Sequence, residues 1–255
     1  MNVDLGLLAP AFVAGLLVVA THVPLGRRVL ARGVVFLDLA IAQVASLGVI
    51  ACVGWGLDLD GWIVQVAAVA AALLASAVLV WTDRTWPNIQ EALIGVLFVS
   101  AASAEFLILA DNPHAGEHVK DMLAGQILWV SWDMLWPVGL LYATLLAVWL
   151  VARDRLGLLG FYVLFALAVT QSVQIVGIYL VFASLILPAL AARCVPARWG
   201  LAAGYAVGVA GYGGGLLLSA LADLPSGPTI VLTLLSAFLA TALIRGICHR
   251  SVMQA

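Results

Sequence analysis

The feature that most constrains this chain is a succession of apolar, charge-free runs, most of them long enough to cross a lipid bilayer. A helical crossing needs about 20 apolar residues, so runs of this length are typical of membrane spans. The runs cover residues 5–23, 34–56, 62–81, 89–110, 134–152, 156–192, 200–222 and 229–244. We therefore expect an all-α polytopic membrane protein, with a single transmembrane domain over residues 1–255.

Composition supports this fold class. Hydrophobic residues make up 65% of the chain and charged residues only 9%, whereas soluble domains are nearer half apolar and a quarter charged. So few charges cannot cover a water-exposed surface, and the expected partner is the lipid bilayer. The net charge of −2 gives no indication of a nucleic-acid partner.

The sixth run, residues 156–192, is too long for one crossing and short for two. Gln171, Gln174 and Gly177 lie in its middle, and they favour two helices broken near residues 171–177. The arginines decide the number of crossings. If the run crosses twice, one side carries Arg27, Arg28, Arg32, Arg84, Arg153, Arg155, Arg193, Arg198, Arg245 and Arg250. The positive-inside rule makes that side the cytoplasm, so we expect nine crossings with the N-terminus outside and the C-terminus inside.

A shorter apolar segment, residues 122–131, precedes the fifth crossing. It is too short to span a bilayer, and we expect it to dip back into the outer membrane face or to lie along it. The tryptophans at positions 129, 132 and 136 would anchor it at the interface.

Residues 109–133 hold the densest group of polar residues in the chain. Asn112 and Pro113 favour a helix start. In a helix that begins there, positions i, i+3, i+4 and i+7 are His114, Glu117, His118 and Asp121, so these four side chains share one face. The candidate ligands are Asp111, His114, Glu117, His118 and Asp121. Imidazoles and carboxylates together suit zinc or manganese before calcium. The alternative is a solvated loop that only joins two membrane helices.

The spacing His114-x-x-Glu-His118 also matches an inverted zinc-peptidase motif. In that alternative, the chain would be an intramembrane metallopeptidase. The motif lies on a surface loop with no evident third ligand downstream, which favours the binding function over the enzyme.

Four segments together resemble the permease subunit of the zinc, manganese and iron uptake family of ATP-binding-cassette importers. They are RRVLARGVVFLDLAIAQVASLGV (27–49), LAGQILWVSWD (123–133), QIVGIYLVFASLILPALAA (174–192) and LLSALADLPSGPTI (217–230). The resemblance implies a permease in the bacterial inner membrane that works as a homodimer, with the metal pathway between its two copies. It also implies a cytoplasmic ATPase dimer and a periplasmic metal-binding protein as partners. ATP hydrolysis would take place on the partner, so no catalytic residue and no bound cofactor are expected here. The cargo would be zinc, or else manganese or iron.

Two departures from the family pattern are visible. When the family's Gly-Val is aligned on residues 48–49, its His falls at Gln43 and its Asp falls at Leu39, next to Asp38. In addition, the family carries a cytoplasmic ATPase-docking helix between the fifth and sixth crossings. Here the connection is short, so Arg153, Asp154 and Arg155 are the candidate docking residues. A relative that is no longer coupled to an ATPase stays open as an alternative.

Polar residues inside or near the ends of the runs are the candidates for the pathway, because an unpaired charge in a bilayer is costly and usually faces a cavity or a partner. They are Glu105, Asp38, Gln43, Gln171 and Gln174. Asp38 could instead pair with an arginine near the cytoplasmic surface. The three glutamines could instead form hydrogen bonds between helices.

Overall fold

The computed structural model describes residues 5–54, 62–109, 127–152 and 155–245. These residues form nine α-helices and three short 3-10 turns, and no strand occurs among them. The α-helices are α1 (Leu5–Arg32), α2 (Leu37–Gly54), α3 (Trp62–Thr85), α4 (Gln90–Leu109), α6 (Trp132–Ala152), α7 (Leu158–Val176), α8 (Ile178–Arg193), α9 (Gly200–Ala222) and α10 (Ser226–Arg245). The turns are η1 (Pro87–Ile89), η2 (Ile127–Trp129) and η3 (Ala197–Trp199).

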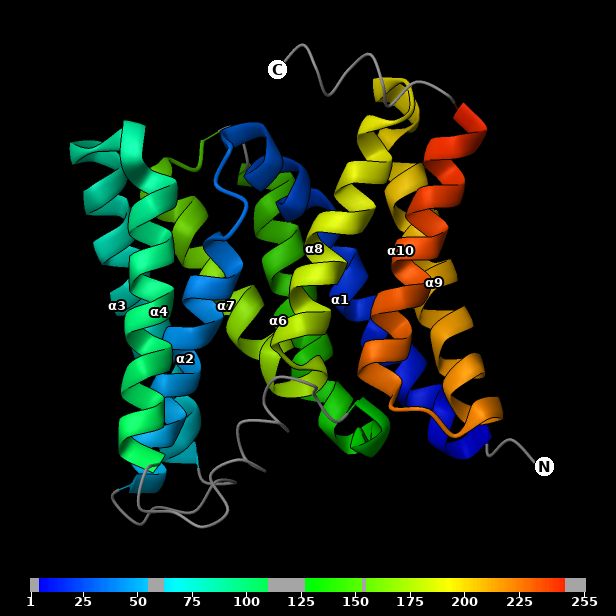
Figure 1. Ribbon diagram of the computed structural model, residues 1–255, viewed down its shortest axis with the longest axis horizontal. Coiled ribbons are helices and arrows are strands. Elements are labelled where there is room, and N and C mark those ends of the chain that lie inside the picture. Colours follow the sequence, from blue (N-terminus) through cyan, green and yellow to red (C-terminus); the bar gives the residue numbers. More distant parts are fainter. Residues whose placement is uncertain (1–4, 55–61, 110–126, 153–154, 246–255) are drawn as a thin grey trace.

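Successive helices alternate in direction along the bundle (Figure 1). Helices α1, α3, α6, α8 and α10 finish at the end where α2, α4, α7 and α9 begin (Figure 1). The described arginines at these helix ends are Arg27, Arg28, Arg32, Arg84, Arg155, Arg193, Arg198 and Arg245. We call this end of the bundle the arginine end. The alternation gives the sidedness that the positive-inside rule requires for nine crossings.

Seven of the described helices are long and apolar enough to cross a membrane, and α2 and α8 are shorter apolar helices. At a rise of about 1.5 Å per residue, a helix as short as α8 reaches less than the roughly 30 Å of a hydrocarbon core. The all-α membrane architecture is therefore confirmed, with α8 as its shortest helix at 16 residues.

The expected break in the sixth run is confirmed at Gly177, which separates α7 from α8. Its φ of 80° lies in the left-handed region, which glycine adopts without steric cost. The Gly177 N–H donates to the Val173 carbonyl and closes α7, while the Gly177 carbonyl accepts from the Val181 N–H and starts α8. One glycine thus ends one helix and begins the next, so the two helices are joined by a single residue.

Helix α1 packs against α6, α7, α8 and α9, while α2, α3 and α4 form a group at the opposite side of the molecule (Figure 1). Helix α7 also packs against α3 and α2, and α8 contacts α1, α2, α9 and α10, so these two helices connect the two sides. The described part of the predicted re-entrant segment contains η2, which packs against α1 and α10. There Ile127 is buried, whereas the Trp129 side chain is 79% exposed, as expected for an interfacial anchor.

Candidate functional site

A groove of about 580 Å³ lies between α2, α4, α8 and α10, and we call it the Glu105 groove. Helical periodicity sets its lining, because residues four or seven apart share a face. Its walls are formed by Leu39, Gln43 and Ser46 of α2, Phe98, Ala102 and Glu105 of α4, Ile178, Tyr179, Phe182, Ala183, Ile186 and Leu187 of α8, and Val231 and Leu235 of α10. The groove is therefore apolar apart from a few side chains of α2 and α4 and one tyrosine of α8.

The polar centre of this groove is the contact between Gln43 and Glu105. Gln43 Nε2 donates to Glu105 Oε2 across the two helices at 2.5 Å, and Ser46 lies beside the same carboxylate. Glu105 is only 4% exposed, and its Oε1 atom has no hydrogen-bond partner in the described part of the chain. Glu105 also makes no ion pair with any described residue. A buried carboxylate with an unused oxygen atom beside a cavity is suited to receive a cation.

Asp38 lies in the first turn of α2 and is 1% exposed. The backbone amide of Leu39 lies beside its carboxylate, and a helix N-terminus favours negative charge. Among the described residues Asp38 forms no ion pair, since Arg32 pairs with Asp83 instead. Leu39, one position further along, lines the Glu105 groove because it shares a face with Gln43. A pathway role for Asp38 stays a prediction.

The other two candidate glutamines lie near the end of α7, outside the lining of the Glu105 groove. Gln171 is half-buried and Gln174 is exposed. Of the five pathway candidates, the structure thus brings together Gln43 and Glu105.

The predicted metal ligands Asp111, His114, Glu117, His118 and Asp121 lie outside the described residues, as do the docking candidates Arg153 and Asp154. Arg155 is described and exposed, in the short connection from the last residue of α6, Ala152, to the first residue of α7, Leu158. Within the described ranges no group of three or more His, Cys, Asp or Glu residues could hold a metal ion.

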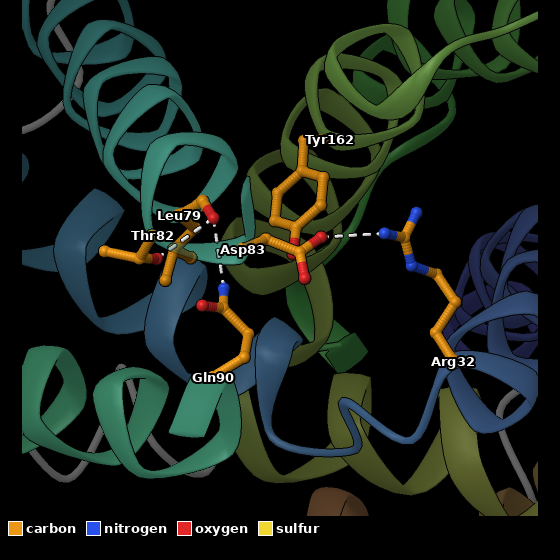
Figure 2. A network of polar contacts seen from close by, with 6 residues as sticks. All are labelled: Arg32, Leu79, Thr82, Asp83, Gln90 and Tyr162. Atoms are coloured by element: carbon orange, nitrogen blue, oxygen red, sulfur yellow. Dashed lines mark hydrogen bonds and ion pairs between the residues drawn. The ribbon is translucent and has the colours of Figure 1, made fainter. Parts of the chain in front are cut away.

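A polar network at the arginine end was not predicted from the sequence (Figure 2). Arg32 at the end of α1 forms an ion pair with Asp83 of α3 at 2.7 Å, and the Tyr162 hydroxyl of α7 donates to the same carboxylate oxygen at 3.5 Å. The Arg32 guanidinium also lies 5.6 Å and 5.8 Å from the ring centroids of Phe161 and Tyr162. Nearby, Gln90 of α4 donates to the Leu79 carbonyl of α3 at 3.0 Å. These contacts tie four helices together where the arginines gather.

The signal for the ion pair was present in the sequence, because opposite charges follow two apolar runs that end on the same side. Positions in the sequence alone did not show which arginine would form an ion pair with Asp83.

The model of the ABC 3 transport family matches residues 4–162 and 154–245 of this chain. The chain belongs to the ABC 3 transport family. This membership confirms the resemblance to permease subunits of ATP-binding-cassette importers, and it covers nearly the whole chain.

A solved structure described as PsaBC from Streptococcus pneumoniae in complex with Fab has the same fold. The comparison gives a TM-score of 0.72 with 21% sequence identity, and it covers 100% of this chain and 96% of that chain. The ABC 3 permease therefore has the architecture of that structure over its full described length.

Proposed function

We propose that this chain is the permease subunit of an ATP-driven importer of divalent transition metal ions, with zinc as the first candidate and manganese or iron as the alternatives. The observation that supports the proposal best is the Glu105 carboxylate. It lies in an apolar helix, faces a groove and has one oxygen atom without a partner in the described chain. A metal cation passing through the groove would supply the missing countercharge.

The lining of the Glu105 groove also supports a set of metal ligands that differs from the family pattern. The family's Asp and His fall at Leu39 and Gln43, and both of these residues line the Glu105 groove. Glu105 on the facing helix α4 offers the carboxylate that Leu39 lacks. With its side-chain amide flipped, Gln43 would offer a carbonyl oxygen in place of the imidazole of the family's His. Such an oxygen-rich set would bind zinc more weakly than a set with imidazole.

In its described part, one copy of the chain has no group of three or more His, Cys, Asp or Glu side chains that could hold a metal. A second copy, with its Glu105 groove turned toward the first, would double the set and cover the apolar walls. We therefore place the pathway between the two subunits of a homodimer.

The loop with His114, Glu117, His118 and Asp121 would receive the metal at the outer mouth from a periplasmic binding protein. Asp111 would contribute at the start of this loop. The variant His114→Ala/His118→Ala is expected to reduce uptake at low metal concentration and to have less effect at high concentration. Equal uptake by the variant and the wild type at every concentration would show that this loop only joins two membrane helices.

A cytoplasmic ATPase dimer would hydrolyse ATP and bind the arginine end. Since α6 and α7 are separated by only a short connection, Arg153, Asp154 and Arg155 would form a small docking surface. A small, charged contact should weaken in salt, because exposed ion pairs are screened.

The test of the proposed function is metal uptake into proteoliposomes that contain the chain together with an ATP-binding-cassette ATPase from the same organism. We expect uptake of zinc, manganese or iron that requires ATP and stops when the ATPase cannot hydrolyse it. Parallel assays with the three ions identify the preferred cargo. No uptake of any of them with an active, bound ATPase would contradict the proposal, and failure of every ATPase to bind would favour the uncoupled relative.

We further expect the arginine end to face the cytoplasm of a bacterial inner membrane, with the N-terminus outside. In a background with serine in place of the native cysteines, Ala115→Cys should react with an impermeant thiol reagent added outside intact cells. Ala197→Cys, at the arginine end, should react only after the cells are opened. Labelling of position 197 from outside would reverse the proposed orientation.

A further inference from the structure

A second groove, separate from the Glu105 groove, lies at the arginine end between α1, α6 and α9. It has a volume of about 350 Å³, and we call it the Arg27 groove. One part of its wall is basic, with Arg27 and Arg28 of α1. The rest is mainly apolar and includes Leu146 and Leu150 of α6 and Leu201 of α9. The metal pathway proposed above does not use any of these residues.

The basic part of the groove has a positive charge that the described chain does not neutralise. Arg27 is half-buried and Arg28 is exposed, and neither forms an ion pair with a described residue. A methyl group added to Gly200, the first residue of α9, would lie 3.5 Å from Nη2 of Arg27. The Arg27 guanidinium therefore lies at the N-terminus of α9, where the helix dipole adds positive potential.

The first amide of α9 is already used, since the Gly200 N–H donates to the Ala197 carbonyl of η3, so α9 contributes its dipole to the groove. The N-cap residue of α9, Trp199, makes no side-chain hydrogen bond to the first turn. The positive end of the α9 dipole and the two guanidinium groups together form a favourable environment for an anion.

Pro24 and Tyr205 shape the groove from inside. A proline within a helix removes the hydrogen bond to the carbonyl four residues earlier, which here belongs to Ala20. The Tyr205 hydroxyl of α9 donates to that Ala20 carbonyl at 3.1 Å. Pro24 and Tyr205 both line the groove, so the contact that satisfies the interrupted helix also fixes the spacing of α1 and α9.

The apolar part of the groove continues onto a surface suited to acyl chains. Leu150 is 63% exposed, and the neighbouring Val151 of α6 is 84% exposed. In a membrane-spanning helix, such side chains face lipid. A ligand in this groove would thus meet two arginines at one end and hydrocarbon at the other, which is the charge pattern of an anionic phospholipid.

We propose that the Arg27 groove is a binding site for one anionic phospholipid. Its phosphate accepts hydrogen bonds from Arg27 and Arg28 beside the start of α9, and its acyl chain lies along Leu146, Leu150 and Leu201. Arginine suits this role because its planar group can donate two hydrogen bonds to one phosphate. Basic pockets between membrane helices bind anionic headgroups in the same manner.

The test measures the melting temperature of the purified full-length chain in neutral detergent, with added phosphatidylglycerol, phosphatidylcholine or inorganic phosphate. We expect phosphatidylglycerol to raise the melting temperature by roughly 5 °C and the other two to have little effect. In Arg27→Gln/Arg28→Gln we expect phosphatidylglycerol to bind roughly 30-fold more weakly, as two lost contacts to an anionic lipid imply. Native mass spectrometry measures the retained lipid directly.

The matched control is Arg84→Gln/Arg193→Gln, which removes two exposed arginines that do not line this groove. The control should retain phosphatidylglycerol as the wild type does. If both double variants lost phosphatidylglycerol equally, the effect would come from general surface charge and the proposal would be overturned. An equal response to phosphatidylcholine would overturn it as well, and an equal response to inorganic phosphate would assign the groove to a soluble anion.

A second variant keeps the arginines and blocks the apolar part of the groove. Leu150→Trp is expected to weaken retention of phosphatidylglycerol and to leave the melting temperature without lipid near that of the wild type, because position 150 is exposed. If Arg27→Gln/Arg28→Gln keeps its lipid but loses co-purification with the ATPase, the groove is an ATPase contact and the lipid proposal is wrong.

Discussion

Replacing Glu105 by glutamine is expected to reduce metal uptake about 100-fold, which corresponds to about 2.7 kcal/mol of lost binding or transition-state stabilisation. Of the described residues that line the Glu105 groove, this one alone carries a charge. Glutamine has nearly the same shape and keeps an oxygen that can accept the hydrogen bond from Gln43, so the change removes the charge with little effect on packing. The measurement is the initial rate of uptake in proteoliposomes with the ATPase present.

The same variant should not destabilise the folded protein. A buried carboxylate without an ion-pair partner carries a desolvation cost, and removing its charge should leave stability unchanged or increase it. The control is Ser103→Ala on the same helix, since Ser103 is exposed and its hydroxyl only donates to the Val99 carbonyl of its own helix. Normal uptake by Glu105→Gln would show that metal does not pass through this groove.

Much of the fold could be predicted from the sequence, because bilayer thickness fixes the length of an apolar run. The run at 200–222 became α9 over the same residues, and the break at Gly177 followed from residues that disfavour a continuous helix. The first run was predicted to end at position 23, yet α1 continues to Arg32. Long basic side chains let a helix extend into the interface after its charge-free part has ended.

The Glu105 groove could not be predicted in the same way. In water, apolar periodicity marks the buried face of a helix, but in a bilayer both the lipid-facing and the buried faces are apolar. On α4, Val96 and Leu107 are exposed whereas Ile94 is buried, and nothing in their chemistry separates them. Glu105 could be selected because a charge within an apolar run is itself a signal. The position of Gln43 opposite Glu105 depends on helix packing. The sequence could therefore identify Glu105 as a candidate but could not identify Gln43 as its partner.

Replacing Gly26 by alanine is expected to destabilise the protein by about 3 kcal/mol, the upper end of the range for overpacking a buried site. Gly26 lies in α1 where that helix crosses α8, and a Cβ atom there would overlap the backbone carbonyl oxygen of Leu185. It would also lie 3.1 Å from the Cβ of Ala189. A backbone atom in a buried helix cannot turn away as a flexible side chain can, so α1 and α8 would have to separate.

The matched control is Gly95→Ala in α4, where no atom lies within 4 Å of the added Cβ. There the same substitution removes only the conformational freedom of glycine, and it should stabilise the helix by roughly 0.5–1 kcal/mol. Unfolding in mixed micelles measures both free energies. A loss of stability in Gly26→Ala together with a gain in Gly95→Ala would establish close packing of α1 on α8. Changes of the same sign in the two variants would contradict it. Because α8 also supplies Tyr179, Phe182 and Ile186 to the Glu105 groove, separation of the two helices should lower uptake together with stability.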